Sequence, residues 1–174
     1  LHPHCRRQRQ MCIRDSGDCC GESGNCNRFP GGDSFRFAFM NRAVFLDRDG
    51  TLIKDAHYLK DPEQIEIIEG VGCSLDAIKK SGFGIFMHTN QSGITRGYYG
   101  WEDVRACNHR MLQMLNLPDD FFDQVCIAPE DRFVPGGLRK PSPKFELEMI
   151  SRYDLMPRRC WMVGDKWIDA ETGP

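Results

Sequence analysis

The chain alternates short, unbroken apolar runs with longer segments in which apolar residues recur at helical spacing. The unbroken runs predict buried β-strands at 42–47, 83–90, 122–129 and 160–165. The segments with helical spacing predict α-helices at 69–82, 101–116 and 142–155. Strands that alternate with helices form a parallel sheet with helices on its faces, so the pattern predicts one α/β domain.

Two of the predicted helices carry end signals. Gly82 stands where the first helix should end, a position that favours glycine. Ser142 has the chemistry of an N-cap for the third helix, with Pro143 at its first helical position and Glu146 in its first turn. We therefore expect this third helix to start directly after Ser142.

Polar residues follow each of the four predicted strands. In chain order they are Asp47 and Asp49, Thr89 and Asn90, Arg139 and Lys140 after a loop, and Asp165. In an open parallel sheet the ligand site lies outside the carboxyl ends of the strands. We therefore expect these side chains to converge on one edge of the sheet.

Three of these groups are carboxylates. Asp47, Asp49 and Asp165 would repel one another at that edge unless a cation lay among them. No histidine or cysteine stands beside them in the strand-end motifs, and a purely oxygen donor set suits Mg²⁺. The sequence thus predicts a magnesium site made by these three aspartates.

The remaining groups suit a phosphoryl substrate. Lys140 supplies positive charge, and Thr89 and Asn90 offer neutral donors. Asp47 could attack phosphorus and form an aspartyl phosphate. Asp49, two residues further on, could protonate the leaving oxygen and later activate water.

Each motif taken singly has an ordinary structural interpretation. An Asp-x-Asp pair on a loop is usually solvated, "TNQSG" would serve as a turn, and "RKP" would serve as a surface pair before a helix. Their occurrence in this order, at successive strand ends, favours a shared site over those separate interpretations.

Composition narrows the classes of partner. The 174 residues are 40% hydrophobic and 28% charged, which is typical of one globular domain, and the formal net charge is −2. Without a basic stripe, a nucleic-acid partner is not expected. The sequence contains neither a long apolar run nor a secretory signal, so we expect a cytoplasmic monomer that has no membrane partner.

Residues 1–39 differ in composition from the rest. They lack periodicity and contain five of the nine cysteines. A metal knuckle of Cys12, Cys19, Cys20 and Cys26, a disordered tail and a non-native leader are the alternatives. We favour the leader, because "MCIRDS" is typical of translated adapter sequence and Met40 is a plausible start. The domain is therefore assigned to 40–174, with the four later cysteines as small, partly buried apolar residues.

The motifs "FLDRDGTL", "HTNQSGITRG", "RKP" and "VGDKWID" resemble those of the haloacid dehalogenase superfamily of phosphatases. The likeness covers about residues 42–172 and is greatest to the subfamily of heptose bisphosphate and histidinol-phosphate phosphatases. It implies a Rossmann-like α/β fold that is capless. Because such domains continue with a further helix and strand, it also implies a truncation at the C-terminus.

The resemblance implies a role for each matching residue. Asp47 would be the nucleophile and a Mg²⁺ ligand, and Asp49 the general acid/base that touches the metal through its backbone carbonyl. Thr89 and Lys140 would stabilise the transferring phosphoryl group. Asp165 would complete the metal site, and Asp169 would stand behind it. The implied substrate-binding residues are Arg48, Asp55, Tyr58, Asn90, Gln91, Ser92, Arg139 and Lys166.

One departure concerns a structural zinc that such phosphatases usually carry. Cys126 matches the first ligand position, but Ala128 replaces the expected histidine, and "PGGLRKP" replaces a Cys-x-Cys. One thiol cannot hold a tetrahedral zinc, so zinc is predicted absent. We expect turn chemistry at 135–137 to hold this loop instead.

The leading functional prediction is a Mg²⁺-dependent phosphomonoester hydrolase acting on a small phosphorylated metabolite. The substrate predicted first is D-glycero-D-manno-heptose 1,7-bisphosphate, cleaved at the 7-phosphate, and histidinol phosphate is the near alternative. An inactive, truncated fragment is a third. A binding module without turnover is disfavoured because Asp47 is intact. His88 is expected to pack away from the site, and His109 to lie on the surface.

Overall fold

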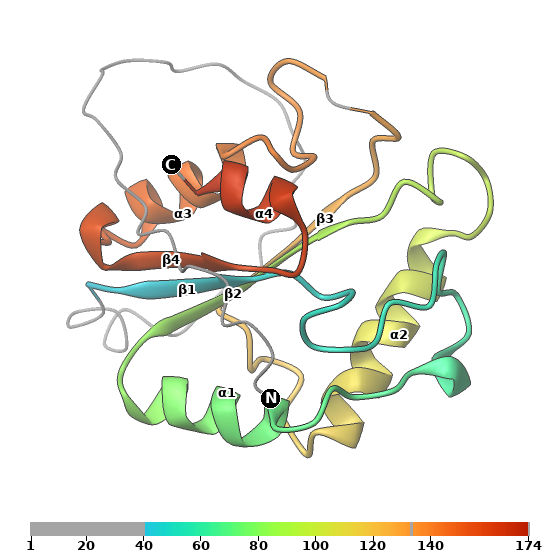
Figure 1. Cartoon of the computed structure of the whole chain (residues 1–174), viewed down its shortest axis with the longest axis horizontal. Coiled ribbons are helices and arrows are strands. Elements are labelled where there is room, and N and C mark those ends of the chain that lie inside the picture. The colour runs from blue at the N-terminus through green and yellow to red at the C-terminus, as the bar shows by residue number, and fades with distance from the viewer. Residues whose placement is uncertain (1–40, 133, 174) are drawn as a thin grey trace, which may run out of the picture.

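The computed structural model describes residues 41–132 and 134–173 (Figure 1). Its centre is a four-stranded, all-parallel sheet with the strand order β3-β2-β1-β4. The strands are β1 (Ala43–Leu46), β2 (Gly84–Asn90), β3 (Gln124–Ala128) and β4 (Cys160–Val163). The predictions made for residues 1–39, including the cysteine knuckle, lie outside the described residues.

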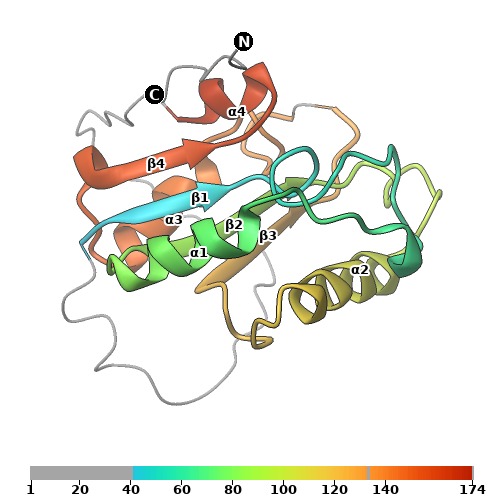
Figure 2. The same cartoon turned by 60° about the horizontal axis from the view of Figure 1, so that its bottom comes forward.

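Helices cover both faces of this sheet. They are α1 (Val71–Lys80), α2 (Trp101–Met114), α3 (Lys144–Arg152) and α4 (Trp167–Thr172), with 3₁₀ turns η1 (Pro62–Gln64) and η2 (Pro157–Arg159). Figures 1 and 2 show α1 and α2 on one side of the sheet and α3 and α4 on the other. The predicted α/β architecture is confirmed. Within the described residues, no helix is long and apolar enough to cross a membrane.

Strand β1 is apolar throughout because both of its faces are buried. Val44 and Leu46 of β1 belong to the core beneath α1 and α2. Between them, Phe45 points to the opposite face, where its ring stacks on Phe86 at 4.9 Å between centroids. Phe145 of α3 meets Phe45 edge-on at 6.0 Å. A covered parallel sheet therefore accounts for the unbroken apolar runs.

All predicted elements are present, but one end signal was wrong. The third helix begins at Lys144, with Pro143 at the cap position and no side-chain cap. The Ser142 hydroxyl instead donates to the Gly137 carbonyl at 2.7 Å. The preceding loop therefore occupies the group that would have capped the helix, and the helix starts later than predicted.

That loop is held by a tight turn, as predicted for 135–137. The Gly137 N–H donates to the Val134 carbonyl at 2.8 Å, and the Leu138 N–H donates to Glu130 Oε1 at 2.9 Å. Cys126 is buried, and burial raises the pKa of its thiol far above the ordinary value. The loop carries Lys140 to the edge where the strands end.

Candidate active site

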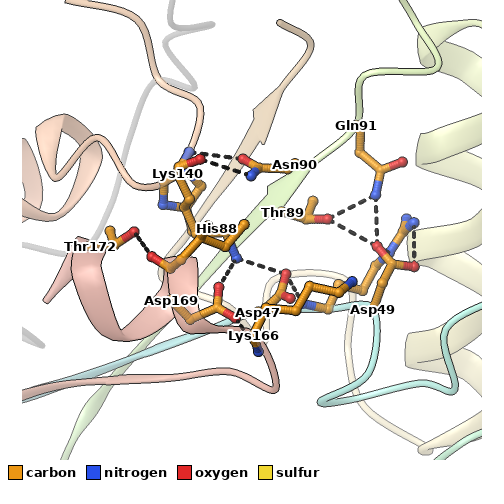
Figure 3. A network of polar contacts seen from close by, with 12 residues as sticks. Asp47, Asp49, His88, Thr89, Asn90, Gln91, Lys140, Lys166, Asp169 and Thr172 are labelled. Carbon is orange, nitrogen blue, oxygen red and sulfur yellow. Dashed lines mark hydrogen bonds and ion pairs between the residues drawn. The ribbon is translucent and has the colours of Figure 1, made fainter. Parts of the chain in front are cut away.

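The carboxyl ends of β1 and β4 bring three carboxylates together. Oxygen atoms of Asp47, Asp165 and Asp169 all lie within 4.8 Å of one another. Lys140 Nζ is 2.8 Å from Asp47 Oδ1 and 2.7 Å from Asp169 Oδ1 (Figure 3). Lys140 thus contacts two of the three carboxylates, and the carboxylates outnumber this one buried ammonium group.

This excess fits a divalent cation. Burial raises the pKa of Asp47 to about 6, opposed by the Lys140 charge and reinforced by the Asp169 charge. Burial also raises the pKa of Asp165. Burial is the main cause of both shifts, and repulsion from Asp169 adds to each. The all-oxygen donor set is the kind that Mg²⁺ prefers.

The membership of this cluster differs from the sequence-based expectation. Asp169 was placed behind the metal site, yet its carboxylate lies in the cluster, 2% exposed. It also accepts a hydrogen bond from the Lys166 N–H at 3.0 Å. The Asp49 carboxylate is not a member of the cluster. The contact of its backbone carbonyl with metal stays a prediction.

Asp49 is instead held by hydrogen-bond donors on both oxygens. Arg48 Nε donates to Asp49 Oδ2 at 3.2 Å, and Arg48 Nη2 donates to Oδ1 at 3.1 Å. Thr89 Oγ1 donates to Oδ2 at 3.2 Å, and Gln91 Nε2 does so at 2.8 Å (Figure 3). Four donors therefore define the orientation of this carboxylate.

The side chain of Arg48 turns inward towards α2. Arg48 is 1% exposed, and its remaining Nη1 donates to Asn108 Oδ1 of α2 at 2.9 Å. Its guanidinium is buried between Asp49 and α2, and the contact of Arg48 with substrate stays a prediction. Sequence reasoning missed Asn108 because an asparagine inside a helix gives no local signal of such a role.

Gln91 is itself oriented by a buried tyrosine. The Tyr99 hydroxyl donates to Gln91 Oε1 at 2.7 Å. Burial raises the pKa of Tyr99, so the hydroxyl keeps its proton and remains a donor. The amide nitrogen of Gln91 then faces Asp49 and the Thr89 hydroxyl, 2.8 Å from each.

Asn90 and Arg139 are occupied by the loop that carries Lys140. Asn90 Oδ1 accepts from the Lys140 N–H at 2.9 Å, and Asn90 Nδ2 donates to the Lys140 carbonyl at 3.2 Å. Arg139 Nη1 donates to the Glu130 carbonyl at 3.0 Å. Asn90, at the end of β2, therefore anchors the backbone of Lys140, and the contact of Asn90 with substrate stays a prediction.

The segment 55–58 closes over the same edge. Lys166 Nζ is 2.8 Å from Asp55 Oδ2, and this hydrogen bond lowers the pKa of Asp55. His57 and Tyr58 have positive φ angles of 38° and 59°. The Tyr58 hydroxyl accepts a hydrogen bond from Arg96. Such strained residues cluster at functional sites.

Ser92 is half-buried in the loop after β2. Its carbonyl accepts from the Arg96 N–H at 3.1 Å, which holds that loop beside Tyr58. The contact of Ser92 with substrate stays a prediction.

His88 points away from the site, as predicted, but it is more than a packing residue. It is fully buried, with Nδ1 2.6 Å from Glu146 Oε1 and Nε2 2.9 Å from the Leu138 carbonyl. The pair ties β2 to α3 and to the loop that carries Lys140. His109 lies on the surface, as predicted, 2.9 Å from Asp119 Oδ1.

Comparison with known proteins places this site in a family. Residues 56–174 match the model of a haloacid dehalogenase-like hydrolase. The chain belongs to the haloacid dehalogenase-like hydrolase family. This family assignment confirms the resemblance carried by the four strand-end motifs.

Relatives within the family are named D-glycero-β-D-manno-heptose-1,7-bisphosphate 7-phosphatase. The Mesorhizobium japonicum protein is 36% identical over 138 residues, which cover 75% of this chain and 64% of that protein. The Rhodopseudomonas palustris protein is 32% identical over 139 residues, covering 75% and 76% respectively. The Haemophilus influenzae protein is 34% identical over 140 residues, covering 77% and 76%.

Solved structures share the fold of this haloacid dehalogenase-like hydrolase. A Mesorhizobium loti protein described as HAD-like phosphatase is 32% identical, with a TM-score of 0.68, and the match covers 83% of this chain and 71% of that one. The D,D-heptose 1,7-bisphosphate phosphatase of B. bronchiseptica, solved with magnesium and phosphate, has 23% identity and a TM-score of 0.63, covering 75% and 73%.

Substituting Gly50 with Ala is expected to disrupt the carboxylate cluster and its binding of Mg²⁺. Gly50 has φ +88°, and an added Cβ would lie 2.4 Å from the carboxylate carbon of Asp165. We expect at least a roughly tenfold weaker affinity for Mg²⁺, because Asp165 must move. Mg²⁺ titration by calorimetry measures this.

The matched control for Gly50→Ala is Gly70→Ala. Gly70 has nearly the same φ, +85°, but an added Cβ would have no atom within 4 Å. Both variants should lose about 1–2 kcal/mol of stability to backbone strain. Equal Mg²⁺ affinity in the two variants would contradict the predicted role of Asp165.

Without metal, ionisation of Asp47 is expected to destabilise the domain. Its pKa is raised from 3.8 to about 6, so the folded state binds this proton more tightly than the unfolded state. The penalty is fully present above the folded pKa and disappears as the pH falls towards 4. Asp47→Asn should therefore raise the free energy of unfolding at pH 8 by about 3 kcal/mol.

Urea unfolding in the presence of EDTA, at pH 8 and at pH 4, measures this difference. The increase in the free energy of unfolding caused by Asp47→Asn should be close to zero at pH 4. At pH 8, Mg²⁺ should reduce this increase, because it binds and stabilises the wild-type cluster. Asp120→Asn, at an exposed position, is the control and should change little at either pH. A stability increase that does not depend on pH would contradict the buried charge of Asp47 as its cause.

Proposed function

We propose that this domain is a Mg²⁺-dependent phosphomonoester hydrolase that works through an aspartyl phosphate on Asp47. The observation that carries the proposal is the buried Asp47–Lys140–Asp169 arrangement beside Asp165. It concentrates a nucleophile, a counter-charge and a cation site at one point. The family is one of hydrolases, and its named relatives are phosphatases.

The first half-reaction would transfer the phosphoryl group to the protein. An Asp47 carboxylate oxygen attacks phosphorus while the bond between phosphorus and the leaving oxygen breaks. Asp49 donates a proton to that oxygen, and the alcohol departs. Lys140 and Thr89 stabilise the charge on the transferring group.

The second half-reaction would regenerate the carboxylate. Asp49, now ionised, takes a proton from a water molecule that attacks phosphorus, and the bond between Asp47 and phosphorus breaks. Inorganic phosphate is released, and Asp49 again carries its proton. Asp47, Asp165 and Asp169 would hold the Mg²⁺ ion. When bound, that ion supplies positive charge against the phosphoryl oxygens.

The substrate that we propose is D-glycero-D-manno-heptose 1,7-bisphosphate, cleaved at the 7-phosphate. Its support is the name shared by relatives at 32–36% identity. A second support lies in the loops around the site. In the part of the chain that the structure describes, Arg96 forms no ion pair, and it stands beside the exposed Tyr98 and the ring of Tyr58. A cation and aromatic rings suit a phosphorylated sugar.

Phosphate release by the 174-residue chain in the presence of Mg²⁺ tests the proposal. Heptose 1,7-bisphosphate, histidinol phosphate and a 3′-phosphorylated oligonucleotide would be compared at equal concentration. We expect at least a tenfold preference in kcat/KM for the heptose, since each 1.4 kcal/mol of selective contact gives that factor. Preference for histidinol phosphate would replace the substrate, and no release from any phosphomonoester would reject the activity.

The oligomeric state and the compartment are also part of this proposal. We propose that the domain acts as a cytoplasmic monomer on this small metabolite. Analytical ultracentrifugation would test the monomer, and a sedimenting dimer would reject it.

A further inference from the structure

We propose that Asn108 and Tyr99 are positioning residues that set the orientation of Asp49 from two sides. The inference rests on the proposed phosphatase function, in which Asp49 moves the proton. Neither residue reaches Asp49 directly. Each acts through one intermediary, Arg48 or Gln91, that does contact it.

The first side is the link from α2. Asn108 Oδ1 accepts from Arg48 Nη1 at 2.9 Å, while Nε and Nη2 of the same guanidinium donate to the two oxygens of Asp49. A guanidinium is planar, so fixing one nitrogen fixes the plane in which the other two donate. Arg48 is 1% exposed and cannot replace Asn108 with bulk water. Helix α2 therefore determines the direction in which Nε and Nη2 of Arg48 donate.

The second side is the link from the loop after β2. An amide has a donor end and an acceptor end, and only its donor end is attracted to a carboxylate. The Tyr99 hydroxyl donates to Gln91 Oε1 at 2.7 Å, which selects the orientation with Nε2 facing Asp49 Oδ2 at 2.8 Å. Figure 3 shows Gln91 and Thr89 both directed at that carboxylate. Without the hydroxyl, the reversed amide would place an oxygen against Asp49.

The two links act on different atoms of one carboxylate. Arg48 engages both oxygens, whereas Gln91 engages Oδ2 only. Proton transfer requires the acid within hydrogen-bond reach of the leaving oxygen, and small misplacements reduce the rate strongly. Loss of either link should therefore impair the protonation of the leaving oxygen more than the binding of phosphate.

Leaving-group dependence distinguishes this role from a general structural one. An alkyl alkoxide needs its proton in the first step, whereas p-nitrophenolate leaves readily without one. We expect Asn108→Leu to lower kcat/KM roughly 10- to 30-fold on the alkyl phosphate that the wild type hydrolyses best, a part of the full contribution of a general acid. On p-nitrophenyl phosphate the loss should stay below roughly threefold.

Two variants provide controls for this comparison. Asn108→Asp keeps an acceptor for Arg48 and should retain kcat/KM within roughly threefold on both substrates. Gln113→Leu makes a similar polar-to-apolar change at an exposed position of the same helix and should leave kcat/KM unchanged on both substrates. Equal losses on the two substrates in Asn108→Leu, or no loss, would overturn the inference.

Tyr99→Phe tests the link through Gln91. It is a smaller change, because the buried ring remains. We expect a loss of roughly 3- to 10-fold on the alkyl phosphate and less than twofold on p-nitrophenyl phosphate. Tyr153→Phe removes a hydroxyl that donates to the Asp123 carbonyl at 3.4 Å, away from the site, so it is the matched control and should lose no selectivity between them. If the wild type hydrolyses neither substrate, the proposed function fails and the inference falls with it.

Discussion

Replacing Asp47 with Asn is expected to abolish hydrolysis while preserving the fold. The amide has nearly the shape of the carboxylate but cannot attack phosphorus, so kcat should fall at least roughly 10³-fold. The position is 5% exposed and faces Lys140, which can still donate to the amide oxygen. Phosphate release with Mg²⁺, together with circular dichroism, measures both parts of the prediction.

Trapping of the aspartyl phosphate tests directly whether Asp47 is the nucleophile. Acid quenching of the wild type during turnover of a ³²P-labelled substrate should leave acid-stable label on the protein, and Asp47→Asn should carry none. Asp120→Asn removes an exposed carboxylate and should retain full activity and labelling. Turnover by Asp47→Asn, in a sample free of wild type, would reject Asp47 as the nucleophile.

Replacing Lys140 with Met is expected to damage both stability and activity. Lys140 is 2% exposed, and its ammonium group lies between Asp47 and Asp169. Methionine retains most of the volume but leaves two buried carboxylates without a cation. Breaking a buried ion pair in this way typically costs about 3–5 kcal/mol. Loss of the charge that faces the phosphoryl group should lower kcat roughly 10²- to 10³-fold.

The destabilisation of Lys140→Met should depend on pH and on metal. Because the pKa of Asp47 is already raised to about 6, loss of the nearby ammonium should raise it further. The penalty should be largest at pH 8 and should shrink as the pH falls and the carboxylates take up protons. Mg²⁺ at pH 8 should restore part of the lost free energy, because it replaces the missing charge.

Urea unfolding with EDTA and with Mg²⁺ tests these expectations. The control is Lys144→Met, because Lys144 is exposed and its Nζ donates to the Gly136 carbonyl, at 3.1 Å. That variant should change stability by less than about 1 kcal/mol. Comparable losses in the two lysine variants would mean that the buried ion pairs do not dominate.

The secondary structure was largely predictable from the spacing of apolar residues. A strand buried on both faces is mostly apolar, which is why β1 and residues 84–87 of β2 stand out as unbroken runs. The helix ends were less predictable. Ser142 has the local chemistry of a cap, but the Gly137 carbonyl, five residues earlier, competes for its hydroxyl. Whether that carbonyl is near depends on the path of the loop.

The location of the site was also predictable, because parallel strands all end at one edge. Asp47, Lys140 and Asp165 were assigned to this edge from the sequence, and the structure brings their charged groups together. Contacts with substrate by the remaining predicted residues stay predictions. The sequence could not show that the side chain of Arg48 turns inward towards α2.

The amino-acid sequence by itself determined the α/β architecture, the edge of the sheet that carries the chemistry, and the identity of the proposed nucleophile. Only the tertiary structure decided which partners surround those groups. Asp169 joins the carboxylate cluster, and Asn108 and Tyr99 hold the groups that contact Asp49. Periodicity reports which face of an element is buried, whereas these contacts depend on how separate elements pack, and Arg48 and Asn108 are 60 residues apart in the chain.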